Sequence, residues 1–219
     1  MDIDGVWIRA RGITARGPEG NAFENVHLHV EPGALAVITG AAGTGRTSLL
    51  LALAGRMRVI TGDLVVSGHV LPGESRAVRR LVRPARLRPG CELERSHRVS
   101  EAVTERRMIS GVRAEHIADA LALVGLAPYR RALVRELHPA DRLLFEIALA
   151  AATAPAGLVV DDADAGLPPA SRHRVWSALR GVAATGTTVL ASATDPPSKE
   201  YEVCHLPARP HHRRHGSRV

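Results

Sequence analysis

The feature that most constrains this chain is a short glycine-rich loop between two apolar segments. The loop reads GAAGTGRTS at residues 40–48 and follows the apolar run ALAVIT at residues 34–39. Because this run is short and contains Val and Ile, it predicts a buried strand. Residues 47–54 (TSLLLALA) predict a helix that ends at Gly55, a residue well suited to a helix C-terminus. The order strand, glycine loop, helix predicts an α/β fold.

Loops of this kind bind phosphate groups. Their glycines let backbone N–H groups turn inward to phosphate oxygens, and the N-terminus of the following helix adds a favourable dipole. An ordinary strand-to-helix turn is the alternative interpretation. We expect all nine positions to contribute to phosphate binding. They are Gly40, Ala41, Ala42, Gly43, Thr44, Gly45, Arg46, Thr47 and Ser48.

Two side chains of this loop refine the expected chemistry. Thr47 directly follows the basic residue, so its hydroxyl is a candidate magnesium ligand. Arg46 stands where such loops carry lysine. Its charge still attracts phosphate, but the planar guanidinium is bulkier than an ammonium and directs its donors differently. We therefore expect Arg46 to hold phosphate in an altered register.

A second chemical motif follows the apolar segment LVV at residues 158–160, which ends in Asp161 and Asp162. In nucleotide-hydrolysing proteins with a phosphate loop, a strand-end aspartate holds the magnesium that neutralises the β- and γ-phosphates. We assign Asp161 to this metal site together with Thr47. Asp162 is the candidate catalytic residue that orients or activates water. The alternative for Asp162 and Asp164 is a pair of solvated acids in a turn.

The first part of the chain predicts strands in an antiparallel layer. Residues 26–30 alternate between apolar and polar side chains, as in a half-buried strand. Residues 64–66 and 69–71 predict a strand pair around a Ser-Gly turn. From about residue 74 to about residue 153 the pattern becomes helical, so we expect a helical insertion there.

The sheet pattern returns in the last third of the chain. Residues 158–160 and 187–191 predict two strands, separated by a helix at about residues 169–184. Strands that alternate with helices pair in parallel. The expected architecture is therefore an α/β phosphate-loop core with a parallel sheet, an N-terminal antiparallel β layer and an inserted α-helical subdomain.

Composition limits the partners of the chain. A formal net charge of +7 is compatible with nucleic acid, but arginine supplies 28 of the 29 basic residues and these are scattered along the chain. Few aromatics are present for stacking on bases, which argues against nucleic acid as a partner. Cys91 and Cys204 have no partner at metal-ligand spacing and are expected to be structural. We expect no membrane span and no signal peptide, hence a cytoplasmic protein.

One domain is expected over residues 1–207, followed at residues 208–219 by a basic, His- and Arg-rich tail. A short tail of this composition is expected to be solvated and disordered.

With these motifs in this order, the chain resembles the ATP-binding subunit of ABC transporters from about Val6 to Pro207. Residues 26–33 resemble the strand and Pro-Gly turn before the family's Walker A loop, and residues 158–162 resemble its Walker B strand. The resemblance implies an ATPase core that uses ATP and Mg²⁺. It also implies a homodimer, or a heterodimer with a related ATP-binding subunit, and a separate membrane permease driven from the inner face of the cell membrane.

The start of a predicted helix departs from the family's pattern. The family's signature loop LSGGQ aligns with LHPAD at residues 137–141. Pro139 removes a backbone N–H, Ala140 adds a methyl group, and Asp141 brings negative charge towards a phosphate. The same residues are a favourable helix start, because proline suits the first turn and an acid suits the positive helix end.

Other short motifs depart as well. Asp162 replaces the catalytic glutamate and is shorter by roughly 1.5 Å. Thr194 stands at the switch histidine and cannot exchange a proton near neutral pH. Pro168 replaces the dimer-contact aspartate, residues 81–86 contain no Q-loop glutamine, and no aromatic residue near Gly17 is placed to stack on adenine.

These departures lead to one main hypothesis and two alternatives. The main hypothesis is a subunit that binds magnesium-ATP and hydrolyses it slowly. The first alternative is a nucleotide-binding regulatory module without hydrolysis, and the second is a phosphate-loop protein that acts on nucleic acid.

Overall fold

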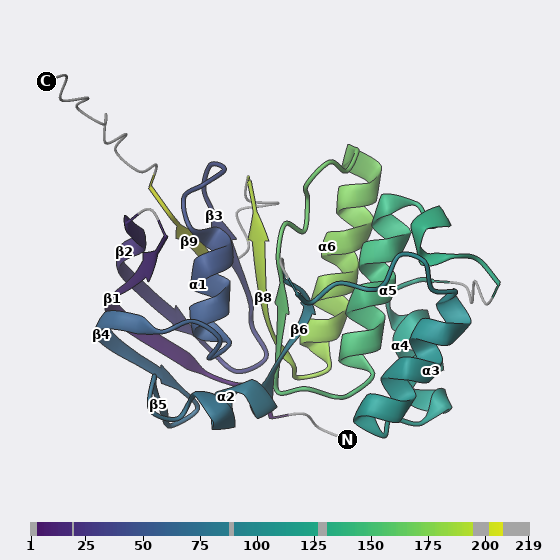
Figure 1. Ribbon diagram of the computed structural model, residues 1–219, viewed down its shortest axis with the longest axis horizontal. Helices are drawn as coiled ribbons and strands as arrows, with labels where there is room; N and C mark the ends of the chain where they lie inside the picture. Colours follow the sequence, from purple (N-terminus) through teal and green to yellow (C-terminus); the bar gives the residue numbers. More distant parts are fainter. Residues whose placement is uncertain (1–3, 19, 88–89, 127–130, 195–201, 208–219) are drawn as a thin grey trace, which may run out of the picture.

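The computed structural model describes residues 4–18, 20–87, 90–126, 131–194 and 202–207 (Figure 1). Within these ranges the chain forms two β-sheets, with helices between and beside them. The predicted tail at residues 208–219 lies outside the described residues.

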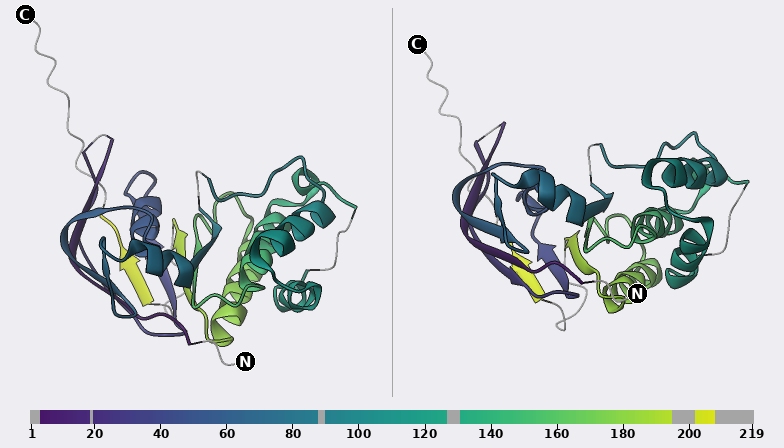
Figure 2. Two further views of the ribbon diagram at one scale, coloured as in Figure 1. Left: turned by 60° about the horizontal axis from the view of Figure 1, so that its bottom comes forward. Right: turned by 90° about the horizontal axis from the view of Figure 1, so that it is seen from below.

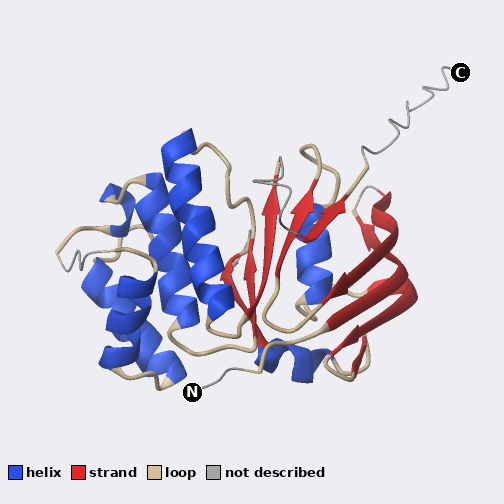
Figure 3. Ribbon diagram, turned by 180° about the vertical axis from the view of Figure 1, so that it is seen from behind, coloured by secondary structure: helices blue, strands red, loops and turns tan. Residues whose placement is uncertain are grey.

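The central sheet is parallel, with the strand order β6-β7-β8-β3-β9 (Figure 3). Its strands are β3 (Leu35–Thr39), β6 (Val82–Arg86), β7 (Gly157–Val160), β8 (Thr188–Ala193) and β9 (Glu202–His205). Each neighbouring pair is parallel. Because the carboxyl ends of parallel strands meet at one edge of a sheet, the segments that follow β3, β7 and β8 gather there.

The second sheet is antiparallel, with the strand order β2-β1-β4-β5. Its strands are β1 (Ile8–Gly17), β2 (Gly20–Val30), β4 (Val59–Val66) and β5 (His69–Leu71). Helix α1 (Arg46–Leu53) lies between the two sheets and contacts strands of both (Figure 1). Contact with both sheets explains the apolar run LLLAL at residues 49–53 of α1, in which four of the five side chains are buried.

Alternate residues of the parallel strands face two different cores. In β3, Ala36 and Ile38 pack on the side of α1 and the antiparallel sheet, whereas Leu35 and Val37 pack on the opposite side. There the sheet is covered by α5 (Pro139–Ala151) and α6 (Pro169–Ala184) (Figure 2). Burial on both faces explains why the parallel strands are continuous apolar runs.

The helical part lies on the far side of α5 and α6 from the antiparallel sheet (Figure 2). It contains α3 (Val99–Ser110) and α4 (Ala114–Leu123). Helix α4 contacts both α5 and α6, and its Ile117 is buried in the core on that side of the sheet. Pro139 occupies the first turn of α5, also as predicted.

The prediction of a helical pattern throughout residues 74–153 is wrong at one place. After α2 (Ser75–Leu81) the chain forms β6, which pairs with β7 at the edge of the parallel sheet. The sequence VRPAR has no apolar run that would predict a strand, and its proline is tolerated because β6 is an edge strand. The helical insertion is therefore interrupted by a strand of the core.

The predicted fold class is confirmed. The parallel sheet, the antiparallel layer and the helical insertion are all present, and α6 has the predicted bounds. The patterns do not predict β1 or β9. In the described part of the chain, no helix combines the length and the apolar character needed to cross a membrane.

Candidate functional site

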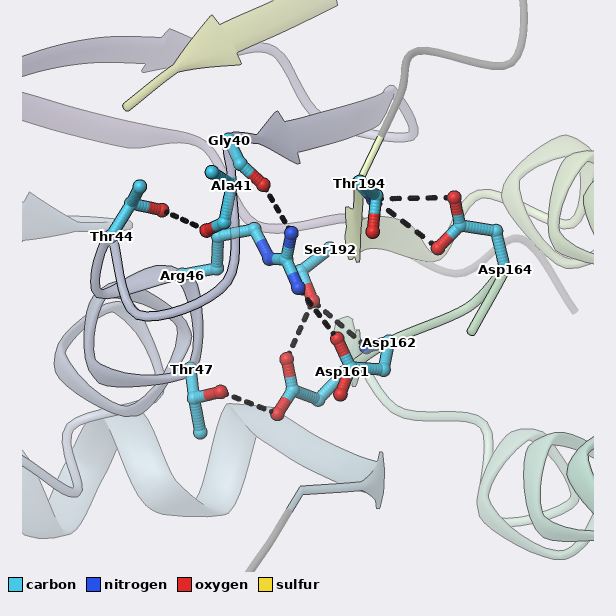
Figure 4. Close-up of polar contacts among 10 residues, drawn as sticks. All are labelled: Gly40, Ala41, Thr44, Arg46, Thr47, Asp161, Asp162, Asp164, Ser192 and Thr194. Carbon is cyan, nitrogen blue, oxygen red and sulfur yellow. Dashed lines mark hydrogen bonds and ion pairs between the residues drawn. The ribbon is translucent and has the colours of Figure 1, made fainter. Parts of the chain in front are cut away.

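Three strands bring the two predicted motifs to one edge of the parallel sheet (Figure 4). Strand β3 leads into the loop at residues 40–48, and β7 ends just before Asp161 and Asp162. Strand β8 lies between them in the sheet and carries Ser192 near its end. The two motifs, far apart in the sequence, therefore face each other across the end of β8.

The loop combines an exposed crown with a buried base. Its crown, at residues 41–43, is exposed, whereas Gly40 and Thr44 are buried. The Thr44 hydroxyl donates a hydrogen bond to the Ala41 carbonyl at 2.9 Å, which closes the loop on itself. Residues 46–48 form the first turn of α1. A compact loop at a helix N-terminus provides the backbone donors that phosphate binding needs.

The antiparallel sheet supports this loop at Gly45. The residue has a left-handed φ of 98°, and a side-chain carbon there would overlap the carbonyl oxygen of Ala22 on β2. Only glycine satisfies both requirements. The loop is therefore fixed by β3 and α1 along the chain and by β2 from the side.

The predicted metal ligands are in direct contact. The Thr47 hydroxyl donates to Asp161 Oδ2 at 2.7 Å, and the Ser192 hydroxyl donates to Asp161 Oδ1 at 2.5 Å. Asp161 is only 2% exposed. Both oxygens of its carboxylate are thus oriented by hydroxyl groups, which is how a buried charge is stabilised.

Arg46 and Asp162 also meet, although they lie 116 positions apart in the sequence. Arg46 Nη2 donates to Asp162 Oδ1 at 2.9 Å, and Arg46 Nη1 donates to the carbonyl oxygen of Gly40 (Figure 4). The Arg46 side chain is 12% exposed and that of Asp162 is 32% exposed. The two unusual residues of the site are therefore ion-paired with each other.

The backbone holds Asp162 in this position. Its φ of 49° lies in the left-handed region, and its N–H donates to Ser192 Oγ at 2.8 Å. A non-glycine residue in this region is strained by about 1 kcal/mol or more, so the neighbouring contacts have to maintain it. The Ser192 hydroxyl thus positions both acids. It donates to the Asp161 carboxylate and accepts from the backbone N–H of Asp162.

The donor set fits magnesium bound with a nucleotide. Mg²⁺ takes oxygen ligands and in such sites uses one or two protein groups together with phosphate oxygens and water. Thr47 and Asp161 offer a hydroxyl and a carboxylate that already lie within hydrogen-bonding distance of each other. The assignment of all the loop residues, Thr47 and Asp161 to ATP and Mg²⁺ remains a prediction, as does a catalytic role for Asp162.

Asp164 and Thr194 form a separate contact beside the site. The backbone N–H of Thr194 lies 3.2 Å and 3.3 Å from the two Asp164 carboxylate oxygens. Asp164 is buried, so it is not one of the solvated acids considered from the sequence, whereas Asp162 is partly exposed. Thr194 itself is exposed next to this contact and offers no group that titrates near neutral pH.

The start of α5, where the family's signature loop aligns, is built differently. Asp141 Oδ1 accepts a hydrogen bond from Arg174 Nη2 of α6 at 2.9 Å. The Asp141 side chain is 16% exposed, and it lies in the first turn of the helix, where an acid is favourable. The Asp141 carboxylate therefore forms an ion pair that links α5 to α6.

A second carboxylate of α5 lies at a cavity of about 550 Å³ next to α3. Burial raises the pKa of Glu146 to about 7, although the positive charges of Arg86 and Arg142 act to lower it. Arg86 Nε lies 3.8 Å from Glu146 Oε2. The carbonyl oxygen of Arg86 also accepts from the Asp161 N–H at 2.9 Å. Arg86 therefore contacts both Glu146 and the backbone of Asp161.

A sequence model described as ABC transporter matches residues 23–165, about two-thirds of the chain. The match contains both motifs that meet in the site. The chain belongs to the ABC transporter family. This confirms the resemblance drawn from its sequence, and ATP is the nucleotide that the family binds.

Curated relatives of this ABC protein include ATP-binding proteins named for drug resistance and for import. It is 29% identical over 84% of its length to the daunorubicin resistance ATP-binding protein DrrA3 of Streptomyces coeruleorubidus. It is 28% identical over 86% of its length to the hemin import ATP-binding protein HmuV of Gloeobacter violaceus. The chain spans 58% of DrrA3 and 73% of HmuV, and only 14% of the ABC-type transporter adrC of Penicillium roqueforti.

Solved structures agree on the fold. The structure of cbiO1 from Clostridium perfringens, part of the ABC transporter complex cbiONQ, matches with a TM-score of 0.72 at 16% identity. That match covers 86% of this chain and 78% of cbiO1. The ADP conformation of MJ1267, an ATP-binding cassette of an ABC transporter, matches with a TM-score of 0.71 at 19% identity. It covers 87% of this chain and 82% of MJ1267.

Ser192 is the site residue that sequence reasoning missed. It lies in the segment TVLASA, where a polar side chain interrupts an apolar strand. Ser192 is fully buried, and a buried hydroxyl needs a partner. The signal was therefore present, but only the order of strands in the sheet identifies Asp161 and Asp162 as the partners.

Proposed function

We propose that this ABC protein is the ATP-binding subunit of a transporter and that it binds magnesium-ATP at the loop of residues 40–48. The observation that carries the proposal is the contact between Thr47 and Asp161, which joins the phosphate loop to the strand-end carboxylate. These two residues would hold the metal. Mg²⁺, when bound, neutralises charge on the β- and γ-phosphates.

The proposed subunit hydrolyses ATP slowly. A base must lie within hydrogen-bonding distance of the water it activates, and the Asp162 carboxylate is instead paired with Arg46. It is also one methylene shorter than a glutamate, and Thr194 supplies no titrating group nearby. Binding requires the loop and Asp161, whereas rapid turnover requires groups that this chain lacks or uses elsewhere.

A regulatory module that binds nucleotide without hydrolysis is the second candidate. It is favoured by one specific observation, the pairing of Asp162 with Arg46, because a carboxylate held this way is withdrawn from water activation. Such a module would respond to nucleotide binding alone.

The proposal extends to partners and location. We propose that residues 1–207 are a single ATP-binding domain that forms a homodimer or a heterodimer with a related ATP-binding subunit. A membrane permease would be the second partner, contacted at the cytoplasmic face of the cell membrane. Support comes from family membership and from the exposed apolar side chains of Met108 and Ile109 on α3, which are 81% and 75% exposed.

Magnesium-dependent ATP binding and turnover, measured on one preparation, test this function. We expect binding in the micromolar-to-millimolar range with slow turnover, and much weaker binding for Arg46→Ala. Binding with no turnover, even beside a partner subunit or permease, would favour the regulatory module. Absence of binding in the parent chain would contradict both candidates.

A further inference from the structure

Two hydrogen bonds hold the Arg46 guanidinium against the protein itself. One terminal nitrogen of its guanidinium donates to Gly40 in the phosphate loop, and the other donates to Asp162 at 2.9 Å. The side chain is only 12% exposed. The cation that the sequence assigns to phosphate therefore already has an anionic partner and a carbonyl partner.

A phosphate group competes with Asp162 for this cation. Carboxylate and phosphate are both oxyanions that a guanidinium binds through its planar set of N–H donors. Arg46 also belongs to the loop whose backbone is expected to receive the phosphates. Ligand oxygens in that loop would therefore seek the same donors that Asp162 now occupies.

Asp162 is held in place for this contact. Its left-handed backbone conformation is maintained by the hydrogen bond from its N–H to Ser192 Oγ. Ser192 is fully buried on β8, so its position is set by the core of the sheet. The carboxylate is thus presented to Arg46 by rigid elements and not by a long, freely rotating side chain.

We propose that Asp162 is the internal counter-ion of Arg46 and that the nucleotide's phosphate displaces it on binding. The inference rests on the proposed function. It gives Asp162 a role in setting nucleotide affinity, separate from any role in activating water. The two departures from the family's pattern are then functionally linked, because a charge pair within the protein is exchanged for a charge pair between Arg46 and the ligand.

The exchange has two thermodynamic consequences. The ion pair stabilises the nucleotide-free chain, and the same stabilisation opposes binding, because the contact must be broken first. After the exchange Asp162 has no cation and lies near a phosphate of the same charge sign, which also opposes binding. Removing the Asp162 charge should therefore lower stability without nucleotide and raise nucleotide affinity.

A double-mutant cycle separates these consequences. The variants are Asp162→Asn, Arg46→Ala and both together, with calorimetric affinity measured for Mg²⁺ and a non-hydrolysable ATP analogue. Asparagine is chosen because it tolerates the left-handed backbone of Asp162. We expect Asp162→Asn to strengthen binding, and the gain to be about tenfold larger with Arg46 present than in the Arg46→Ala background.

Repulsion alone would give a different result. If Asp162 only repelled phosphate, its neutralisation would strengthen binding equally in both backgrounds, which would overturn the exchange. An unchanged or weaker affinity of Asp162→Asn with Arg46 present would also overturn it. Asp119→Asn is the matched control, since it removes one charge from the exposed face of α4, and it should change the affinity by less than about twofold.

Unfolding of the nucleotide-free variants gives an independent readout. The double variant should be less destabilised than the sum of the two single variants, and saturating analogue should abolish this coupling. Coupling that persists with the analogue bound would overturn the exchange while leaving ATP binding intact. If neither the parent chain nor Asp162→Asn binds the analogue, the proposed function itself is wrong.

Discussion

Polar and charged side chains at the carboxyl edge of the parallel sheet contact one another, whereas two charged side chains of α5 contact neighbouring structural elements. At the sheet edge, Thr47 and Ser192 orient Asp161, and Arg46 pairs with Asp162. In α5, Asp141 pairs with Arg174 of α6, and Glu146 lies near Arg86 of β6. The first region forms the proposed nucleotide site, and the second joins α5 to its neighbours.

This difference bears on how two such chains would cooperate. In the proposed dimer the start of α5 would face the phosphate of a partner subunit, yet Pro139 and Asp141 there remove a donor and add a negative charge. We therefore expect the chain to hold its own nucleotide better than it completes a partner's site.

The largest effect is expected at Gly45, which joins the phosphate loop to the antiparallel sheet. Gly45→Ala would place a methyl group against the Ala22 carbonyl at a left-handed φ. We expect the free energy of unfolding to fall by about 4 kcal/mol, measured by denaturant titration. Gly20→Ala is the control, because Gly20 also has a positive φ but has open space around it. Equal losses in both variants would show that the Ala22 contact is unimportant.

Asp161→Asn tests the metal role assigned at the sheet edge. Asparagine keeps the shape of the side chain but removes the charge that would balance Mg²⁺. We expect the gain in ATP affinity on adding Mg²⁺ to shrink by about a hundredfold. Asp164→Asn serves for comparison, since Asp164 contacts Thr194 and not Thr47. An undiminished magnesium effect in Asp161→Asn would remove Asp161 from the metal site.

Glu146 tests whether charge in α5 governs stability. Its pKa is raised from 4.5 to about 7, so protonation favours the folded chain, and this stabilisation is lost as pH rises through about 7. Relative to Glu146→Gln, we expect the parent chain to lose about 2 kcal/mol of unfolding free energy between about pH 5.5 and about pH 8.5. Parallel stability curves for the two proteins would contradict the prediction.

Ser192→Ala probes the hydroxyl that the two carboxylates share. Without it, Asp161 loses one donor and the Asp162 N–H loses its acceptor. We expect magnesium affinity in the presence of nucleotide to weaken about tenfold. Ser192→Thr keeps the hydroxyl and should recover most of this loss. If the threonine variant binds as weakly as the alanine variant, the position matters for packing alone.

The smallest effect is expected at Asp141, which belongs to the packing region. Its partner Arg174 is 49% exposed, and exposed ion pairs contribute little. Asp141→Asn should lower the free energy of unfolding by less than about 1 kcal/mol. Calorimetry should find ATP affinity in the single chain unchanged within about twofold. A large change in affinity would mean that α5 takes part in the chain's own site.

Local sequence signals predicted the elements that position the site. Residues 34–55 contain all the sequence signals that predict the strand before the loop, the loop itself and the helix after it. Asp161 was also recognisable, because a carboxylate directly after an apolar strand lies at a carboxyl edge. These elements needed no knowledge of distant contacts.

Strands β1 and β6 were not predictable in the same way. In β1 the pairing register shifts between Ala10 and Ala15, so its alternation of buried side chains is interrupted. In β6 the short sequence includes Pro84 and two arginines, and its partner β7 lies far along the chain. Tertiary pairing determines these strands, and single-sequence periodicity does not register it.

The contacts of Ser192 and Arg46 with Asp161 and Asp162 can be predicted only when the order of strands in the sheet is known. Strand β8 separates β3 from β7 in the sheet but follows both in the sequence. In the sequence, Arg46 in place of lysine and Asp162 in place of glutamate are two separate departures from the family's pattern. Only the folded chain shows that the two residues form an ion pair.

The contact between Gly45 and β2 has an evolutionary consequence. Gly45 is required both by its left-handed φ and by backbone packing against Ala22, whereas Gly43, at a φ of 80°, has open space around it and is constrained by its backbone conformation alone. A descendant that no longer met any nucleotide would still be selected to keep Gly45, because replacing it would disturb the fold. Drift at Gly43, with Gly45 retained, is therefore the earliest change we expect in a lineage that abandons ATP.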